Sequence, residues 1–190
     1  MALLTSPRAR RLAISIGAVA LASSVVVARA PEQGEKTVKA AFLYNFTKFV
    51  GWPPSAFENE TEPFRVCVFA DQSFRREVEG MMAGESVLGR PVRVLAPASN
   101  DARRCQIAYF GAAESERAAA VLSPLQKFPV LTVGEGEKFL AAGGLVAFAI
   151  EDDRVRFDVS KATADRSGLV VSSKLLRVAR RVDMNVRPKS

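Results

Sequence analysis

The chain has 190 residues, of which 27 are lysine or arginine and 20 are aspartate or glutamate, and it contains no histidine. The absence of histidine removes the commonest general base and the commonest metal ligand. No phosphate-binding loop and no set of metal ligands is recognisable at a useful spacing. The sequence therefore argues against an enzyme, and we expect no catalytic residue, no metal and no cofactor.

The first 30 residues have the pattern of an export signal that is removed from the mature protein. Three arginines among the first eleven residues precede a sixteen-residue, mostly apolar run, Leu12–Val27. A membrane-spanning helix needs about 20 such residues, so a cleaved signal peptide is favoured over an anchor. We expect residues 1–30 to be a signal peptide, residues 31–190 to form one α/β domain, and the mature protein to be periplasmic.

Removal of this segment changes what the charge implies. It holds four arginines and no acidic residue, so residues 31–190 carry 23 basic and 20 acidic side chains. A net charge of +3 is too small to indicate nucleic-acid binding. Five basic residues near the C-terminus are interpreted as a solvated helix face followed by a frayed tail: Arg177, Arg180, Arg181, Arg187 and Lys189.

The longest helical pattern after the signal runs from Val38 to Pro54. Apolar residues recur there at the three- and four-residue spacing of one helical stripe: Val38, Phe42, Phe46, Phe49 and Val50. Thr37 is expected to cap the start of this helix. Gly51 is expected to end it in the left-handed conformation, and the prolines that follow prevent its continuation.

The next stretch alternates strand and helix patterns, which favours a sheet with parallel pairs. Asp71 or Ser73 is expected to cap the first helix of this stretch, and Gly84 to end it. Gly134 and Gly136 are expected to break the strand that precedes them. The expected strands are 64–70, 91–95, 107–110 and 130–133, and the expected helices begin after Asp71 and span 114–122 and 137–142.

Two alternating runs, 146–150 and 154–159, flank the polar turn Glu151–Asp153 and predict an antiparallel hairpin. A short helix over 161–166, an extended run over 169–171 and a helix capped by Ser172 or Ser173 complete the chain. The pattern predicts a single-domain α/β sandwich with a mixed sheet of about six strands and helices on both faces.

Cys67 and Cys105 are the only cysteines. In an oxidising compartment they could form a disulfide, which would close a loop of 38 residues and stabilise the fold by about 4 kcal/mol. The alternative is two reduced, buried cysteines that act as small apolar residues.

Two aromatic residues are candidates for ligand binding, because they lie off the apolar stripe or at its end. Tyr44 is off the main stripe, and Trp52 follows the helix beside a polar loop. Aromatic anchors contribute strongly to interfaces, so we consider a periplasmic small-molecule sensor or solute-binding domain with a pocket near these residues. A partly buried structural role is the competing interpretation.

Several segments resemble the YfiR family of exported proteins. They are V-K-A-A-F-L-Y-N-F-T-K-F-V-G-W-P at 38–53, P-V-L-T-V-G at 129–134, V-R-F-D-V at 155–159 and G-L-V-V-S-S-K-L-L-R-V-A-R-R at 168–181. The resemblance implies a periplasmic repressor without enzymatic activity that binds the periplasmic sensory domain of a membrane diguanylate cyclase, and so lowers cyclic di-GMP and biofilm formation. It also implies an outer-membrane lipoprotein that sequesters the repressor, and a homodimer.

The resemblance extends to particular residues. It implies a disulfide between Cys67 and Cys105, whereas the second cysteine pair of some family members has no counterpart here. The family also usually has asparagine where this chain has Val159. Because loops and hairpins present side chains on a rigid scaffold, we expect three residues to face the partner: Phe148, Asp158 and Leu169.

Overall fold

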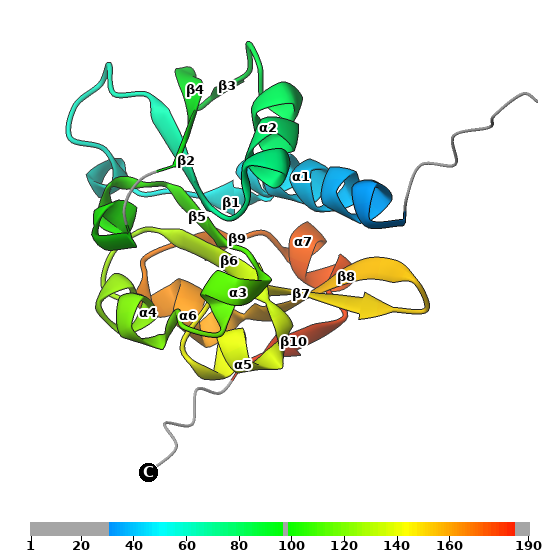
Figure 1. Cartoon of the computed structure of the whole chain (residues 1–190). Helices are drawn as coiled ribbons and strands as arrows, with labels where there is room; N and C mark the ends of the chain where they lie inside the picture. The colour runs from blue at the N-terminus through cyan, green and yellow to red at the C-terminus, as the bar shows by residue number, and fades with distance from the viewer. Residues whose placement is uncertain (1–30, 97–98, 185–190) are drawn as a thin grey trace, which may run out of the picture.

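A computed structural model describes residues 31–96 and 99–184. The predicted signal peptide, Arg187 and Lys189 lie outside the described residues. The chain forms three layers, with a mixed sheet in the middle and helices on both sides (Figure 1). This arrangement confirms the predicted α/β sandwich. None of the described helices combines the length and the apolar character that a bilayer crossing needs.

The main sheet has eight strands in the order β10-β8-β7-β6-β5-β2-β4-β3, two more than expected. The five central strands from β4 to β7 run parallel to one another, whereas β3 is antiparallel to β4 and β8 returns antiparallel to β7. The additional strands, β3 and β10, are two and three residues long and lie at the two edges. The bounds are β2 Phe64–Phe69, β3 Ser86–Val87, β4 Arg90–Leu95, β5 Ile107–Phe110, β6 Leu131–Glu135, β7 Val146–Glu151, β8 Arg154–Ser160 and β10 Arg181–Asp183.

Helix α1, Pro31–Phe49, begins earlier than expected. Thr37 lies inside it and donates a hydrogen bond from Oγ1 to the carbonyl oxygen of Gln33 at 3.0 Å, so it is not the N-cap. Gly51 does not adopt the left-handed conformation. It is extended in β1, Val50–Gly51, which pairs antiparallel with β9, Val170–Val171. The expectation was wrong because pairing with a distant strand, and not a local turn, ends the helix.

The remaining helices are short. Asp71 caps α2 as expected, and its side chain accepts from the backbone N–H of Phe74 at 3.0 Å. The single helix expected over 114–122 is two helices, α3 and α4. The bounds are η1 Pro54–Ala56, α2 Gln72–Met81, η2 Ser99–Arg104, α3 Ala112–Ser115, α4 Ala119–Leu125, α5 Gly136–Ala141, α6 Lys161–Arg166 and α7 Ser173–Val178.

The sheet separates two apolar cores, and β5 shows why. Its residues alternate between the faces, with Ile107 and Tyr109 in the core under α1 and α2 and Ala108 and Phe110 in the core under α4 and α5. All four are at most 3% exposed. Rings from α1 meet rings from the hairpin in the first core, where Phe46 lies 5.3 Å from Phe157 between ring centroids.

The sequence suggested that Gly134 breaks its strand, but it does not. It lies within β6, and the ring of Phe139 on α5 packs directly over it. A Cβ atom at Gly134 would lie 2.4 Å from Cδ2 of Phe139, and one at Gly144 would lie 2.2 Å from its Cε1. The two glycines therefore make room for a fully buried ring, whereas Gly136 has the positive φ of 76° expected of a turn.

Candidate functional site

The candidate site lies where the direction of the sheet reverses. After β2 the chain adds β4 on one side, and it then crosses to add β5 and β6 on the other side. The carboxyl ends of β2 and β5 therefore diverge, with α2 on one face and α3 on the other (Figure 1). In open α/β sheets such a topological switch point leaves a crevice in which ligands bind.

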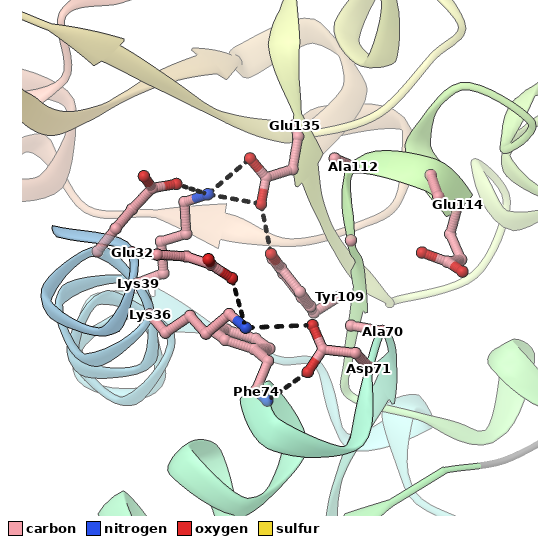
Figure 2. Close-up of a pocket in the computed structure, with 13 residues that line it drawn as sticks. Glu32, Lys36, Lys39, Ala70, Asp71, Phe74, Tyr109, Ala112, Glu114 and Glu135 are labelled. Atoms are coloured by element: carbon pink, nitrogen blue, oxygen red, sulfur yellow. Dashed lines mark hydrogen bonds and ion pairs between the residues drawn. The ribbon is translucent and has the colours of Figure 1, made fainter. Parts of the chain in front are cut away.

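A cavity of about 500 Å³ occupies this crevice. Helix α1 forms one wall, and the ends of β2, β5 and β6 with the starts of α2 and α3 form the others (Figure 2). We call it the switch-point cavity. Seven charged residues line it: Glu32, Glu35, Lys36, Lys39, Asp71, Glu114 and Glu135.

Lys39 and Glu135 form a largely buried ion pair in the cavity. The Lys39 ammonium donates to both carboxylate oxygens of Glu135 at 2.8 and 2.7 Å, and it also pairs with Glu35 at 2.5 Å. The Lys39 side chain is only 7% exposed. Tyr109 donates its hydroxyl to Glu135 Oε1 (Figure 2). Burial, reinforced by the charge of Glu135, raises the pKa of Tyr109, so the phenol stays neutral and remains a donor.

The backbone around Glu135 is also held in place. Its N–H donates to Oγ of Ser115 at 2.9 Å, and the Ser115 hydroxyl donates to the carbonyl oxygen of Phe110 at 2.9 Å. These bonds tie the end of β6 to α3 and to the end of β5. Because three elements fix Glu135, its carboxylate is a rigid part of the cavity wall.

Lys36 organises the opposite side of the cavity. Its ammonium donates to Oγ of Ser73 at 2.8 Å and pairs with Glu32 at 3.0 Å and with Asp71 at 3.5 Å. The hydrogen bond with Glu32 is the main cause that raises the pKa of Lys36. The hydroxyl of Ser73, followed by the N–H of Phe74, lowers the pKa of Asp71 to about 2. Both groups are therefore charged at neutral pH.

The chemistry of this arrangement is that of a binding site. Both lysines are paired with carboxylates, and Tyr109 is held as a neutral phenol. Among residues 31–96 and 99–184 there is no group of three or more cysteine, aspartate or glutamate residues arranged to hold a metal ion. The cavity therefore offers fixed charges and two aromatic rings, those of Phe74 and Tyr109, whose centroids are 4.5 Å apart.

The three residues expected to face a partner are buried, so the expectation that they are exposed was wrong. Phe148 is 1% exposed and packs against Phe42 and Phe46 of α1. Asp158 and Leu169 are each 2% exposed, because Asp158 binds arginines and Leu169 is part of the first core. Contact of these residues with a partner stays a prediction.

The two ligand candidates do not line the switch-point cavity. Trp52 is 8% exposed and donates from Nε1 to the carbonyl oxygen of Gln106 at 3.1 Å, with its ring edge-on to Phe64. Tyr44 donates its hydroxyl to Glu85 at 2.7 Å, and Lys48 lies 4.1 Å from the centre of its ring. Both have structural contacts, and ligand binding by them stays a prediction.

Cys67 and Cys105 are joined by a disulfide, as the resemblance implied. The bridge links β2 to the residue that follows η2.

The switch-point cavity itself was not predicted from the sequence. One signal could have pointed to it, because Asp71 follows one parallel strand and Glu135 ends another, and the carboxyl ends of parallel strands meet at one edge of a sheet.

A family model described as YfiR/HmsC-like (DUF4154) matches residues 36–180, which is more than half of the chain. The chain belongs to the YfiR/HmsC-like family. This family is regulatory, non-catalytic and periplasmic, and the match suggests a periplasmic regulator of cyclic di-GMP signalling. No curated protein matches the sequence.

The solved structures similar to this chain include the following two. One is described as a conserved domain protein from Vibrio cholerae, with 9% identity and a TM-score of 0.52. The other is the ABC domain in complex with L-Trp from Streptococcus pneumoniae, with 10% identity and a TM-score of 0.46. Each match covers 78% of this chain and 60% of the other. At such identities the first likeness shows the fold alone.

Proposed function

We propose that this protein represses a membrane-bound diguanylate cyclase by binding its periplasmic sensory domain, and so lowers cyclic di-GMP and biofilm formation. The observation that carries the proposal is the family match over residues 36–180. The paired charges of the switch-point cavity are consistent with a protein that acts through binding. The proposal includes a homodimer and an outer-membrane lipoprotein that sequesters the repressor.

Repression requires unequal affinity for two states of the cyclase. A protein that binds the active and the inhibited forms equally well shifts no equilibrium, however tight the binding is. A preference of about 3 kcal/mol for the inhibited form changes the ratio of the two forms roughly a hundredfold. The binding surface must therefore contact a part of the sensory domain that differs between the two forms.

We place the contact in the groove between α1 and the β7–β8 hairpin, which we call the hairpin groove. It has a volume of about 800 Å³ and is lined by both apolar and charged side chains. Val38 is 43% exposed and Ile150 is 52% exposed, which is high for large apolar side chains. The groove is lined by Gly34, Glu35, Val38, Phe42, Ile150, Asp153, Arg154, Val155 and Arg156.

A deletion strain tests the regulatory part of the proposal. We expect the deletion to raise cyclic di-GMP and biofilm matrix, because the cyclase loses its repressor. Complementation with the full chain should restore both, and a second deletion that removes the cyclase should abolish the rise. Unchanged cyclic di-GMP in the single deletion would contradict the proposal.

A binding experiment tests the hairpin groove. We expect the exported protein to bind the purified sensory domain, and the double variant Val38→Glu/Ile150→Glu to bind at least tenfold more weakly, since it introduces charge into an apolar contact. The control is Val170→Glu, which adds a charge at a valine that is 71% exposed and lies outside the groove. If the control variant alone weakened binding of the sensory domain, the contact would lie at the β1–β9 pair and not in the groove.

A further inference from the structure

The charges that line the switch-point cavity are unbalanced. Five carboxylates and two ammonium groups face it. An ammonium group has three donors. Lys36 has acceptors on three side chains, and Lys39 has three carboxylate oxygens as acceptors. All six distances lie between 2.5 and 3.5 Å. The phenol of Tyr109 also donates to Glu135. The side-chain donors of Lys36, Lys39 and Tyr109 are therefore all engaged by acceptors of the cavity wall.

The acceptors, in contrast, are in excess. Within the described residues the carboxylate of Glu114 has no hydrogen-bond or ion-pair partner, and it is half-buried on α3. Glu32 and Glu35 each pair with a lysine, and their side chains are 78% and 38% exposed. Figure 2 shows Glu114 on the opposite side of the cavity from the α1 residues Glu32 and Lys36. Two separate regions of the wall therefore offer carboxylate oxygens.

Between these regions the wall is apolar and open. It contains the ring pair of Phe74 and Tyr109, together with Ala70 and Ala112. Gly111 contributes to the opening, because a Cβ atom there would lie 3.1 Å from both the Ala70 Cβ and Glu114 Oε2. Aromatic faces attract cations, and the small residues leave room for a short methylene chain.

From this geometry we propose that the switch-point cavity binds a small organic dication, a short aliphatic diamine. One ammonium group binds Glu114, the second binds Glu32 and Glu35, and the methylene chain lies along the apolar wall between them. Ammonium groups supply donors and no acceptors, which complements a wall that has five carboxylates and whose side-chain donors are already engaged. The location at the topological switch point is an independent reason to expect a ligand there.

The proposal is tested by isothermal titration of the purified residues 31–190 with 1,4-diaminobutane, and with the neutral 1,4-butanediol and the dianion succinate as matched probes. We expect the diamine to bind at least tenfold more tightly than the diol, with no binding of succinate. Glu114→Gln should weaken diamine binding about tenfold, because it removes the charge and keeps the shape. Glu116→Gln, which makes the same change at an exposed neighbour outside the cavity, should not.

The following outcomes would overturn the proposal. They are equal binding of diamine and diol, preference for succinate, or diamine binding that Glu114→Gln leaves unchanged. Absence of binding by every diamine from three to six carbons would do so as well. Circular dichroism of each variant is the control that checks whether the variant is folded. The test uses the protein alone, so its failure would leave the repression of a cyclase untouched.

Discussion

Asp158 on β8 forms a bidentate ion pair with Arg180. Nε of Arg180 donates to Oδ1 of Asp158 at 2.8 Å, and Nη2 donates to Oδ2 at 2.5 Å. Arg181 donates to Oδ2 as well, at 2.8 and 3.2 Å. Burial works to raise the pKa of Asp158, but the hydrogen bonds from Arg180 and Arg181 outweigh it and hold the pKa below its usual range.

These contacts correct the interpretation of the C-terminal basic residues. Arg180 and Arg181 are not on a solvated helix face, because α7 ends at Val178 and Arg181 begins β10. The arginines fasten the last strand to β8, where Arg181 is in register with Asp158. A charge cluster that resembles a soluble tail in the sequence is therefore a structural clamp.

We predict that Asp158→Ala lowers the free energy of unfolding by about 2 to 3 kcal/mol, the range for hydrogen bonds to charged groups. The cost is limited because both guanidinium groups reach water once the carboxylate is gone. Arg177→Ala removes an exposed arginine from the same segment and should change stability little. Urea unfolding followed by circular dichroism measures both, and equal stability of the two variants would contradict the clamp.

The disulfide should contribute more than any single hydrogen bond. Its sequence separation of 38 residues corresponds to about 4 kcal/mol in the chain-entropy account. We predict that Cys67→Ala/Cys105→Ala is less stable than the wild type by about this amount. Reductant should destabilise the wild type to a similar extent and leave the variant unchanged. Insensitivity of the wild type to reductant would show that the bridge does not stabilise the fold.

Asp71 should make stability depend on pH in the acid range. Its pKa is about 2 in the folded chain against 3.8 for an unperturbed aspartate. A depressed carboxyl pKa stabilises the fold above the unfolded pKa, and this contribution is lost as the pH falls from about 4 through about 2. Asp71→Asn, which preserves a helix cap, should lose less stability over this interval than the wild type.

Urea unfolding between pH 5 and pH 2 measures the difference. Asp152→Asn is the control, because it removes one carboxylate at the exposed hairpin turn, where φ is 49° and asparagine is tolerated. This control should follow the wild type. Parallel curves for Asp71→Asn and the wild type would show that Asp71 is not responsible for the acid sensitivity.

Substitution of two glycines by alanine should have opposite effects on the stability of the fold. Gly134→Ala places a methyl group against the buried ring of Phe139, and we predict a loss of about 1 to 3 kcal/mol from overpacking. Gly80→Ala lies on an exposed position of α2 with no atom within 4 Å of the new Cβ, and we predict a gain of up to about 1 kcal/mol. Thermal unfolding compares them, and a stable Gly134→Ala would show that the ring can move aside.

Local rules predicted much of the fold correctly. The hairpin follows from its turn, since Asp152 and Asp153 both have positive φ, which two-residue turns of this kind require. Gly168 ends its helix with a φ of 70°. Asp71 and Ser172 cap helices by accepting a hydrogen bond from the backbone N–H three residues ahead. Each of these features depends on neighbours in the sequence, so the sequence is sufficient to predict it.

The amino-acid sequence by itself determined the helix and strand alternation, the caps, the hairpin and the resemblance to a family. Tertiary structure alone decided the pairing of β1 with β9, the clamp on Asp158 and the switch-point cavity. Lys39 and Glu135 are 96 residues apart, and no local pattern joins them. The physical reason is that periodicity encodes which face of an element is buried, whereas the sheet order decides which polar groups from distant elements meet at its edge.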